Sequence, residues 1–401
     1  MDLKSGMPFW LIKDGLMFNY PKLEKDLNVD VLILGAGISG ALSAYHLSKA
    51  GIDCAVVDAR SIGLGSTCAS TSLLQYEIDV PLCELQHKIG LENAVRSYQL
   101  CAQSILKLQE IASDIGLEDF QLKKSLYYAA GKKDVSFLKE EFKIRKDNNF
   151  AVSFLDKEMI ESEFGFEAPA AILSELGAQT NAYAFTHLLH QFNINNGCKV
   201  YDRTKISAIK HNKDGAQLAT ENKQLIKAKF LIYATGYESV NYLNKKIVGL
   251  QSTYAIISEN GHAGESIWKD DVLIWNTDDP YLYMRTAPNG RIIIGGRDEK
   301  FYNPEKRDGL LEQKSKALKK DFNKLFPDIE FNTDYCWTGT FGSTKDGLPF
   351  IGPYKPLPNS YFSLGFGGNG ITFSLIAAEI ITDLISGKEN ADVKIFAFER
   401  V

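Results

Sequence analysis

The sequence lacks the patterns of several common kinds of site. Its six cysteines are scattered without a CxxC pair, so neither a zinc site nor a disulfide framework is predicted. Basic residues occur in nothing longer than adjacent pairs such as Lys245-Lys246, and the net charge of -5 argues against a nucleic-acid partner. No stretch has the ~18 uninterrupted apolar residues of a membrane-spanning helix. We therefore expect a cytoplasmic protein with reduced thiols, no metal ion and no membrane insertion.

The size and composition of the chain indicate a globular protein with more than one domain. It has 401 residues, of which 45% are hydrophobic, and this is too long for one simple core. Residues 1–28 mix aromatic and charged side chains and precede the first clear strand. We interpret them as an N-terminal extension that packs on the surface.

A strand, a glycine-rich turn, a helix and a second strand are predicted from residue 30 onward. Residues 31–34 are a short apolar run, which is typical of a strand buried on both faces in a parallel sheet. Apolar residues then recur at helical spacing over 38–47, and Gly51 is expected to end the helix. A second apolar run at 54–57 ends at Asp58. This order predicts a complete βαβ unit.

Later segments extend this unit and add a second kind of sheet. Residues 230–234 are another apolar run that predicts a buried strand, whereas 125–130 and 151–155 predict strands of a different, antiparallel sheet. The turn Lys213-Asp214-Gly215 predicts a hairpin. Helices are expected over 91–115, 183–196 and 371–385, and further strands over 281–285 and 291–294.

Pieces of parallel sheet at both ends of the chain bracket antiparallel pieces in the middle. The expected fold class is therefore α/β, or more strictly a mixed α+β arrangement, in which a Rossmann-like nucleotide-binding domain is interleaved with an antiparallel-sheet substrate domain. The predicted nucleotide-binding domain comprises 29–115, 170–240 and 338–391, and the predicted substrate domain comprises 116–169 and 241–337.

The glycines at 35, 37 and 40 have the spacing of a dinucleotide-binding loop. Three glycines at this spacing are weak evidence alone, but here a buried strand precedes them and a helix follows. Gly35 permits the tight turn, Gly37 allows a pyrophosphate to approach, and Gly40 lets the helix pack closely on the strand. Asp58 ends the next strand, where a carboxylate can bind a ribose hydroxyl. Arg60 lies two positions further on, and an arginine near this place would also suit a 2'-phosphate.

Downstream segments favour FAD over NAD. Residues 65–71 (GSTCAST) are small and hydroxyl-bearing, and they offer donors for a second phosphate and close approach to a flat ring. The chain is expected to return to the nucleotide at 234–236 and again at 365–372 (GFGGNGIT). The last loop starts a helix, and a helix N-terminus directed at a flavin would stabilise negative charge on the reduced ring.

Together these motifs resemble the FAD-dependent oxidoreductases that include D-amino-acid oxidase, glycine oxidase and sarcosine oxidase. The resemblance extends from residue 29 to 391 and includes a Tyr-Leu-x-x-Arg strand at 281–285 and a glycine helix start at 369–370. It implies a two-domain fold that binds FAD. The FAD-binding residues predicted from the motifs and the resemblance are Gly35, Gly37, Ile38, Ser39, Gly40, Asp58, Ala59, Arg60, Gly65, Ser66, Thr67, Ser70, Thr71, Gln75, Ile206, Thr235, Gly236, Gly339, Gly367, Gly368, Asn369, Gly370, Ile371 and Thr372.

The resemblance also implies a reaction at a C–N bond. In this family a hydride passes from the carbon next to an amine to flavin N5, and the resulting imine is hydrolysed. The protein's part is to orient the substrate and to keep its amine neutral. A dedicated acid or base is not required, and none of the six histidines lies in a motif that demands catalysis. We expect a small amine or amino acid as substrate, with oxygen or another molecule as electron acceptor.

For amino-acid substrates, the resemblance implies an arginine that holds the carboxylate, and its place here is Phe341. Arg297 and Arg285 are the predicted substitutes, and strand alternation favours Arg297 because it would share a face with Gly295. The alternative for Arg297 is a salt bridge or a domain contact. Tyr281 and Tyr283 are expected to enclose the substrate, although a pair of tyrosines also suits simple packing.

Two features of relatives bear on the flavin and the acceptor. Some relatives attach flavin covalently through a cysteine at the place held here by Trp337, and Cys336 is one residue off, so we predict non-covalent FAD. A lysine that assists the reaction with oxygen in some relatives would fall at Ile293. Because other oxidases also lack it, the choice between oxidase and dehydrogenase stays open.

Two further interpretations remain open at this point. One is a flavoprotein that acts on an amine carried by a macromolecule, such as a modified RNA base or a carrier-bound substrate, although the acidic net charge disfavours RNA. The other is a non-catalytic flavoprotein or a dehydrogenase that uses a nicotinamide alone. An absorbance scan separates the last possibility, because FAD has two visible bands and NAD has none.

Overall fold

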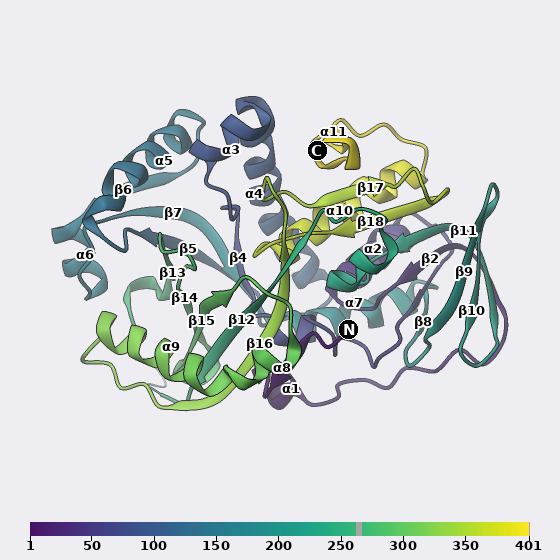
Figure 1. The fold of residues 1–401 in the computed structure, drawn as a ribbon, viewed down its shortest axis with the longest axis horizontal. Helices are drawn as coiled ribbons and strands as arrows, with labels where there is room; N and C mark the ends of the chain where they lie inside the picture. The colour runs from purple at the N-terminus through teal and green to yellow at the C-terminus, as the bar shows by residue number, and fades with distance from the viewer. Residues whose placement is uncertain (262–266, 401) are drawn as a thin grey trace.

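A computed structural model describes residues 1–261 and 267–400 of the chain. Two large sheets lie side by side (Figure 1). The eight-stranded sheet contains β2 (Leu27–Leu34), β3 (Cys54–Val57), β8 (Lys199–Tyr201), β9 (Ile206–Asn212), β10 (Gly215–Thr220), β11 (Leu225–Tyr233), β17 (Phe350–Pro353) and β18 (Ser360–Leu364).

The centre of the eight-stranded sheet is parallel, as the apolar runs predict. Its order is β18-β11-β2-β3-β8, with every neighbouring pair parallel, while β17 pairs antiparallel with β18. Val31, Leu32 and Ile33 of β2 have 0% exposure because both faces of the sheet are covered. The predicted turn joins β9 to β10 as an antiparallel hairpin. The βαβ unit and this hairpin are therefore confirmed.

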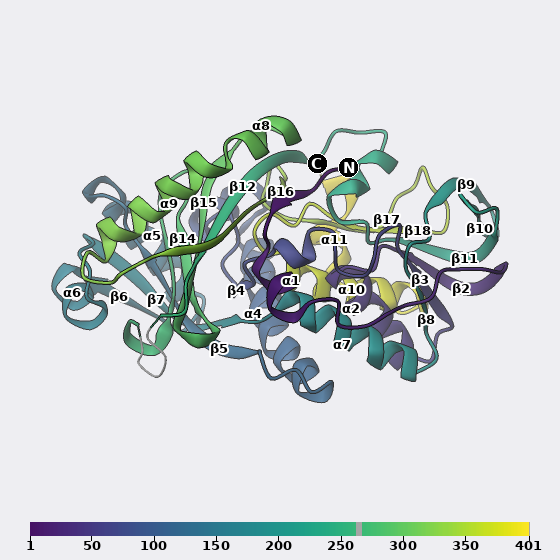
Figure 2. The same ribbon diagram turned by 90° about the horizontal axis from the view of Figure 1, so that it is seen from below.

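Four helices form a layer beside this sheet (Figure 2). They bury a shared apolar cluster, in which the predicted stripe of the longest helix, from Ala94 to Ile111, is fully included. A short helix, α3 (Leu82–Ile89), packs on that long helix. The four helices are α2 (Ile38–Lys49), α4 (Leu91–Asp114), α7 (Ala182–Asn195) and α10 (Gly370–Ile385).

The ten-stranded sheet is antiparallel except for the parallel pair β13 and β5. Its order is β1-β16-β12-β15-β14-β13-β5-β7-β4, with β6 on β7. Its strands are β1 (Lys4–Gly6), β4 (Leu73–Gln75), β5 (Gln121–Tyr128), β6 (Val152–Asp156), β7 (Ala170–Gln179), β12 (Gly249–Ser258), β13 (Leu273–Asn276), β14 (Tyr283–Ala287), β15 (Arg291–Glu299) and β16 (Thr333–Ser343).

Helix α9 (Leu311–Leu325) covers β12, β15 and β16, and its Leu318 and Phe322 are fully buried there. The remaining α-helices of the described chain are shorter or peripheral. They are α1 (Phe9–Asp14), α5 (Val135–Asp147), α6 (Lys157–Phe164), α8 (Pro304–Gly309) and α11 (Val393–Phe396).

The predicted fold class is confirmed, because the chain passes back and forth between a parallel sheet with helices and a mostly antiparallel sheet. The exact domain boundaries remain predictions. Strands β4 and β7 belong to the ten-stranded sheet although both fall inside segments assigned to the nucleotide-binding domain. Strand β4 lines the cavity described below, and β7 pairs with it.

Residues 1–28 are not a surface extension. Strand β1 pairs with β16, and the side chain of Trp10 is only 1% exposed. Figure 2 shows this segment running across the junction of the two halves before it enters β2. The sequence pattern did not predict this burial. The segment buries a few aromatic residues among charged ones, so its apolar residues have neither the spacing of a strand nor that of a helix.

Candidate active site

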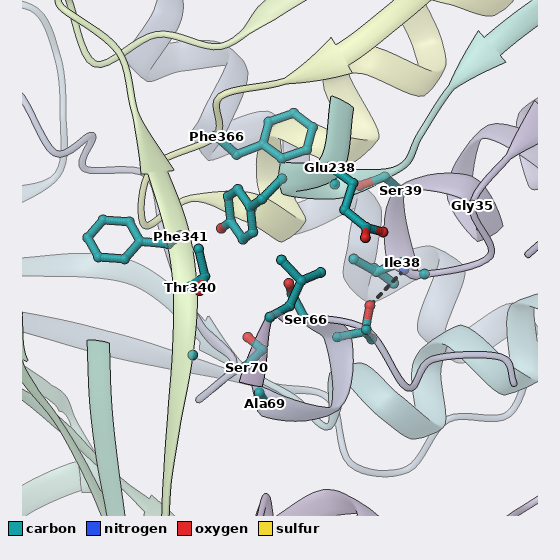
Figure 3. A pocket seen from close by; sticks show the side chains of 18 of the residues that line it. Gly35, Ile38, Ser39, Ser66, Ala69, Ser70, Glu238, Thr340, Phe341 and Phe366 are labelled. Atoms are coloured by element: carbon teal, nitrogen blue, oxygen red, sulfur yellow. Dashed lines mark hydrogen bonds between the residues drawn. The ribbon is translucent and has the colours of Figure 1, made fainter. Parts of the chain in front are cut away.

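A cavity of about 410 Å³ lies where the two sheets meet. The loops after β2, β3 and β11 form one part of its wall, at the carboxyl ends of adjacent parallel strands, where open α/β sheets bind ligands. The start of α10 and strand β16 form the rest. Figure 3 shows Gly35, Ile38 and Ser39 on one side of this cavity and Thr340 of β16 on the opposite side.

The glycine-rich loop has the geometry that a dinucleotide requires. Gly35 has a positive φ of 100°, and a Cβ there would lie 2.4 Å from the carbonyl oxygen of Ala234. A Cβ on Gly40 would lie 1.9 Å from the carbonyl oxygen of Gly35, so α2 approaches the turn as closely as glycine allows. Gly40 itself does not line the cavity, and its role is this packing.

Asp58 holds the loop in place and faces the cavity. Its two carboxylate oxygens accept hydrogen bonds from the peptide N–H groups of Ala36 (2.8 Å) and Arg60 (2.8 Å). Burial raises the pKa of Asp58, and these two hydrogen bonds act in the opposite direction. The Arg60 guanidinium is engaged by both carboxylate oxygens of Glu238, at 2.8 and 2.9 Å. Arg60 is therefore paired within the protein and not committed to a 2'-phosphate.

Replacing Asp58 with alanine is expected to weaken FAD binding about 10- to 100-fold, because two charge-assisted hydrogen bonds that fix the loop are lost. Titration of FAD onto the apoprotein measures the change. Asp53→Ala is the matched control, since Asp53 is exposed and pairs with Lys199 at the surface. Equal affinities in the two variants would contradict the role of Asp58.

The hydroxyl-rich segment supplies donors around the same cavity. The Thr67 hydroxyl accepts the N–H of Ile38 at 3.2 Å, which ties this segment to the start of α2. The Ser66 hydroxyl is buried, lines the cavity and has no hydrogen-bond partner in the described part of the chain. A buried hydroxyl without a partner is unfavourable, and a phosphate oxygen would satisfy it. The glycine cradle, Asp58 and this hydroxyl therefore fit the diphosphate of FAD.

The C-terminal glycine loop completes the cavity at the start of α10. Asn369 does not line it, because its side-chain amide donates to the carbonyls of Gln75 (2.9 Å) and Glu77 (2.8 Å). Thr372 is also outside, with its hydroxyl bonded to the Asn369 carbonyl at 3.0 Å. These two residues hold the loop, whereas Gly367 and Gly368 lie at the cavity itself.

The other predicted cofactor residues all line the cavity. They are Gly35, Gly37, Ile38, Ser39, Asp58, Ala59, Arg60, Gly65, Ser66, Thr67, Ser70, Thr71, Gln75, Ile206, Thr235, Gly236, Gly339, Gly367, Gly368, Gly370 and Ile371. The sequence missed Tyr237, Thr253 and Asp298, among other lining residues, since they occur in no motif.

Tyr281 and Tyr283 lie at the end of the cavity beside the C-terminal glycine loop. Their ring centroids are 5.7 Å apart, and both line the cavity. A Cβ on Gly295 would collide with the Tyr283 ring, at 2.2 Å from its hydroxyl oxygen, so glycine lets this ring lie flat on β15. Burial raises the pKa of Tyr283 to about 12, which keeps its hydroxyl protonated. The pair therefore lines the cavity, at the end that we call the reacting end, and its contact with a substrate remains a prediction.

Arg297, the preferred substrate anchor, is not in the cavity. A bulge interrupts β15, where Gly296 has φ 137° and Arg297 has φ 57°. The alternation that would have put Arg297 beside Gly295 is broken there, and its exposed guanidinium forms a two-pronged pair with Asp321 of α9. The prediction of Arg297 as an anion clamp is therefore wrong, and the salt-bridge alternative is confirmed.

Arg285 is also outside the cavity. It is 2% exposed, and its guanidinium donates to the carbonyls of Ser72 (2.9 Å) and Thr180 (3.0 Å). It lies two residues further along β14 than Tyr283, behind the wall to which Ser72 belongs, and stacks 5.1 Å from the centre of the Trp10 ring. Burial lowers its pKa to about 9, although the charge of Asp119 acts in the opposite direction. Arg285 therefore supports the wall of this cavity and does not line it.

One aspartate lies at the reacting end instead, and a second is exposed at its edge. The bulge in β15 turns Asp298 into the cavity, where its Oδ1 atom is buried and finds no hydrogen-bond partner among the described residues. Burial raises the pKa of Asp298 to about 7. The carboxylate of Asp79 accepts the N–H of Gly368 at 2.9 Å and lies 3.5 Å from the Tyr281 hydroxyl. Phe341, at the place of the expected arginine, also lines the cavity.

The sequence matches the family described as FAD dependent oxidoreductase over residues 30–384. The chain belongs to this family. A glycine oxidase of Bacillus licheniformis is 24% identical over 369 residues, which cover 89% of this chain and 93% of that protein. The gamma-glutamylputrescine oxidoreductase of Escherichia coli (strain K12) is 23% identical over 395 residues, which cover 92% of this chain and 86% of that protein.

Solved structures agree with the fold. The crystal structure of glycine oxidase from Geobacillus kaustophilus superimposes with a TM-score of 0.78 at 19% identity, covering 94% of this chain and 99% of that chain. The predictions of an FAD-dependent oxidoreductase and of FAD as its cofactor are confirmed by the family. Within the described residues, no helix combines the length and the apolar character needed to cross a membrane.

The cysteines bear on how FAD is held. All six lie in the described part of the chain, and none of them lines the cavity. Trp337 faces the cavity, whereas its neighbour Cys336 packs with the apolar cluster under α9, on the other face of the sheet. No thiol is therefore placed to bond to a ligand in the cavity, and non-covalent FAD stays our prediction.

Proposed function

We propose that the protein oxidises a C–N bond of a small amine or amino acid. The observation that supports this is the continuity of one cavity from the dinucleotide loop at Gly35 to the tyrosine pair at the C-terminal glycine loop. When bound, FAD supplies the oxidising chemistry, because its N5 accepts a hydride from the carbon next to the amine. Two relatives named above are a glycine oxidase and a gamma-glutamylputrescine oxidoreductase. Their names refer to an amino acid and to an amine, and both belong to the proposed substrate class.

The residues of the chain contribute position and environment. The Tyr281 and Tyr283 rings form an apolar wall that excludes water and aligns the carbon to be oxidised. Their hydroxyls stay protonated, since burial raises both pKa values, and so they donate hydrogen bonds without acting as bases.

The proposal predicts that the yellow holoenzyme is bleached under anaerobic conditions by at least one member of a panel of D-amino acids, N-methylglycines and aliphatic amines. Absorbance in the two visible flavin bands measures the bleaching. Dithionite serves as the positive control, because it reduces bound flavin without a substrate site. Bleaching by dithionite but by no compound of the panel would contradict the proposed function. Oxygen consumption with the active compound then separates an oxidase from a dehydrogenase.

A further inference from the structure

Among the described residues, those at the reacting end of the cavity include a carboxylate and no basic side chain. Asp298 lines this end with a buried Oδ1 that finds no hydrogen-bond partner among the described residues. Asp79 is exposed at the edge of the cavity, where its carboxylate accepts the N–H of Gly368 and lies 3.5 Å from the Tyr281 hydroxyl. Burial is the main cause of the raised pKa of Tyr281, and the charges of Asp79 and Asp298 raise it further.

The basic side chains of the region are held elsewhere. Among the described residues that line the cavity, Arg60 and Lys205 are the basic ones, and both are at the opposite end, beside Asp58. Arg297 is paired with Asp321 outside the cavity. The Lys314 ammonium, the basic group that most lowers the pKa of Asp298, is bonded to Glu299 at 2.5 Å. Within the described residues, no cation is therefore bonded to Asp298 directly.

A carboxylate in a desolvated cavity is stabilised by a cation or else takes up a proton. A substrate ammonium group would supply that cation and would accept the free Oδ1 as a hydrogen-bond partner. The carboxylate of an α-amino acid would instead lie near Asp298 inside the cavity and Asp79 at its edge, and like charges repel. The tyrosine rings add favourable faces for an alkylammonium chain.

We propose, building on the proposed C–N oxidation, that the substrate is an aliphatic diamine or polyamine whose non-reacting ammonium group is bound by Asp298 and Asp79. The amine that is oxidised is the other one, and it enters the reaction in its neutral form. The two aspartates thus set substrate specificity, and α-amino acids are disfavoured.

Three ligands of equal backbone length test this on the unmodified holoenzyme: 1,4-diaminobutane, butylamine and 4-aminobutanoate. The expected kcat/KM for anaerobic flavin reduction is about 10- to 100-fold higher with the diamine than with butylamine, the gain of a charge-assisted hydrogen bond to a carboxylate. The kcat/KM values for 4-aminobutanoate and D-alanine are expected to be lower than the value for butylamine. A preference for either carboxylate-bearing compound would overturn the inference.

Two variants locate the effect. Asp298→Asn and Asp79→Asn keep the side-chain shape but remove the charge, and each is expected to raise KM for 1,4-diaminobutane about tenfold or more, with a smaller change for butylamine. Asp328→Asn is the matched control, because it removes one negative charge from an exposed residue distant from the cavity lining. An unchanged diamine KM in both cavity variants would overturn the assignment of these residues.

The outcomes separate this inference from the proposed function. If amino acids bleach the flavin as well as diamines do, C–N oxidation stands and diamine selectivity fails. If no amine bleaches it, the proposed function fails, and binding is then measured by the shift that 1,4-diaminobutane causes in the visible flavin spectrum. A saturable shift that is lost in Asp298→Asn supports the cation site, and no shift overturns it.

Discussion

Replacing Gly40 with alanine is expected to lower the affinity for FAD by about 10- to 100-fold, the result of an overpacking penalty of about 1–3 kcal/mol. The added Cβ would lie 1.9 Å from the carbonyl oxygen of Gly35, so α2 must move away from the turn. That movement displaces the N–H groups at the start of the helix that would face the diphosphate. The flavin-to-protein absorbance ratio after purification and FAD titration of the apoprotein both measure the loss.

Gly309→Ala provides the control for this substitution. Gly309 ends helix α8, and a Cβ built there meets nothing within 4 Å. The control is expected to bind FAD as the parent does and to unfold at the same temperature. Full flavin content and an unchanged dissociation constant in Gly40→Ala would show that the loop tolerates a wider spacing than the structure indicates.

Replacing Arg145 with methionine is expected to lower the free energy of unfolding by about 3–5 kcal/mol, because two buried carboxylates lose their counter-charge. Arg145, Glu141 and Glu77 have side chains that are 0%, 0% and 1% exposed, and the guanidinium donates to Glu141 at 2.6 Å and to Glu77 at 3.1 Å. Burial raises the pKa of Glu141, but the charge of Arg145 and the hydrogen bonds from Arg145 and Cys83 together bring that pKa below its usual value. Urea or thermal unfolding followed by circular dichroism measures the loss.

The matched control lies on the same helix. Lys143→Met removes an ion pair with Asp147 in which both side chains are more than half exposed, and exposed pairs of this kind contribute about 0–1 kcal/mol. Since the Glu77 carbonyl also accepts the side-chain amide of Asn369, Arg145→Met is expected to loosen the C-terminal glycine loop as well. Equal stability of the two variants would mean that the buried triad relaxes or protonates without cost.

The sequence predicted the half of the site that depends on local backbone geometry. The nucleotide loop could be predicted because its signals lie within a few adjacent residues. These signals are the glycine spacing, the apolar runs on each side and Asp58 at a strand end, and the structure has the same turn, helix and strand. The hydroxyl segment and the start of α10 follow from the same reasoning. The sequence assigned three further residues to the cofactor, namely Gly40, Asn369 and Thr372, but they support the residues that line the cavity. Residues that pack closely or hold a loop occur in the same sequence pattern as residues that contact a ligand.

The reacting end could not be predicted because it depends on one irregularity. Strand alternation assigns Arg297 to the cavity, whereas the bulge at Gly296 shifts the register by one residue and brings Asp298 there instead. The two side chains have opposite charge, so an error of a single residue inverts the expected preference of the site. The glycine pair at 295–296 is the sequence signal that a bulge was possible.

Two further elements were missed for a different reason. Helix α9 is rich in lysine and buries mainly Leu318 and Phe322. These two residues are too few to form a helical apolar pattern that can be recognised in the sequence. The N-terminal segment gains its order from distant partners, namely β16 for its strand and the cavity wall for Trp10. Long-range partners of this kind leave no periodic pattern in the segment itself.

The indole groups of Trp10 and Trp337 donate hydrogen bonds to neighbouring carbonyls, those of Ser70 and Ala69, each at 2.8 Å. Two of the four tryptophans in the chain are thereby fixed against consecutive peptide groups of the wall that faces the flavin. An isoalloxazine bound in the cavity would accept energy absorbed by these indoles. The ultraviolet emission of the protein should therefore dim as the cofactor loads and brighten on its release, giving an optical reporter of occupancy that needs no added label.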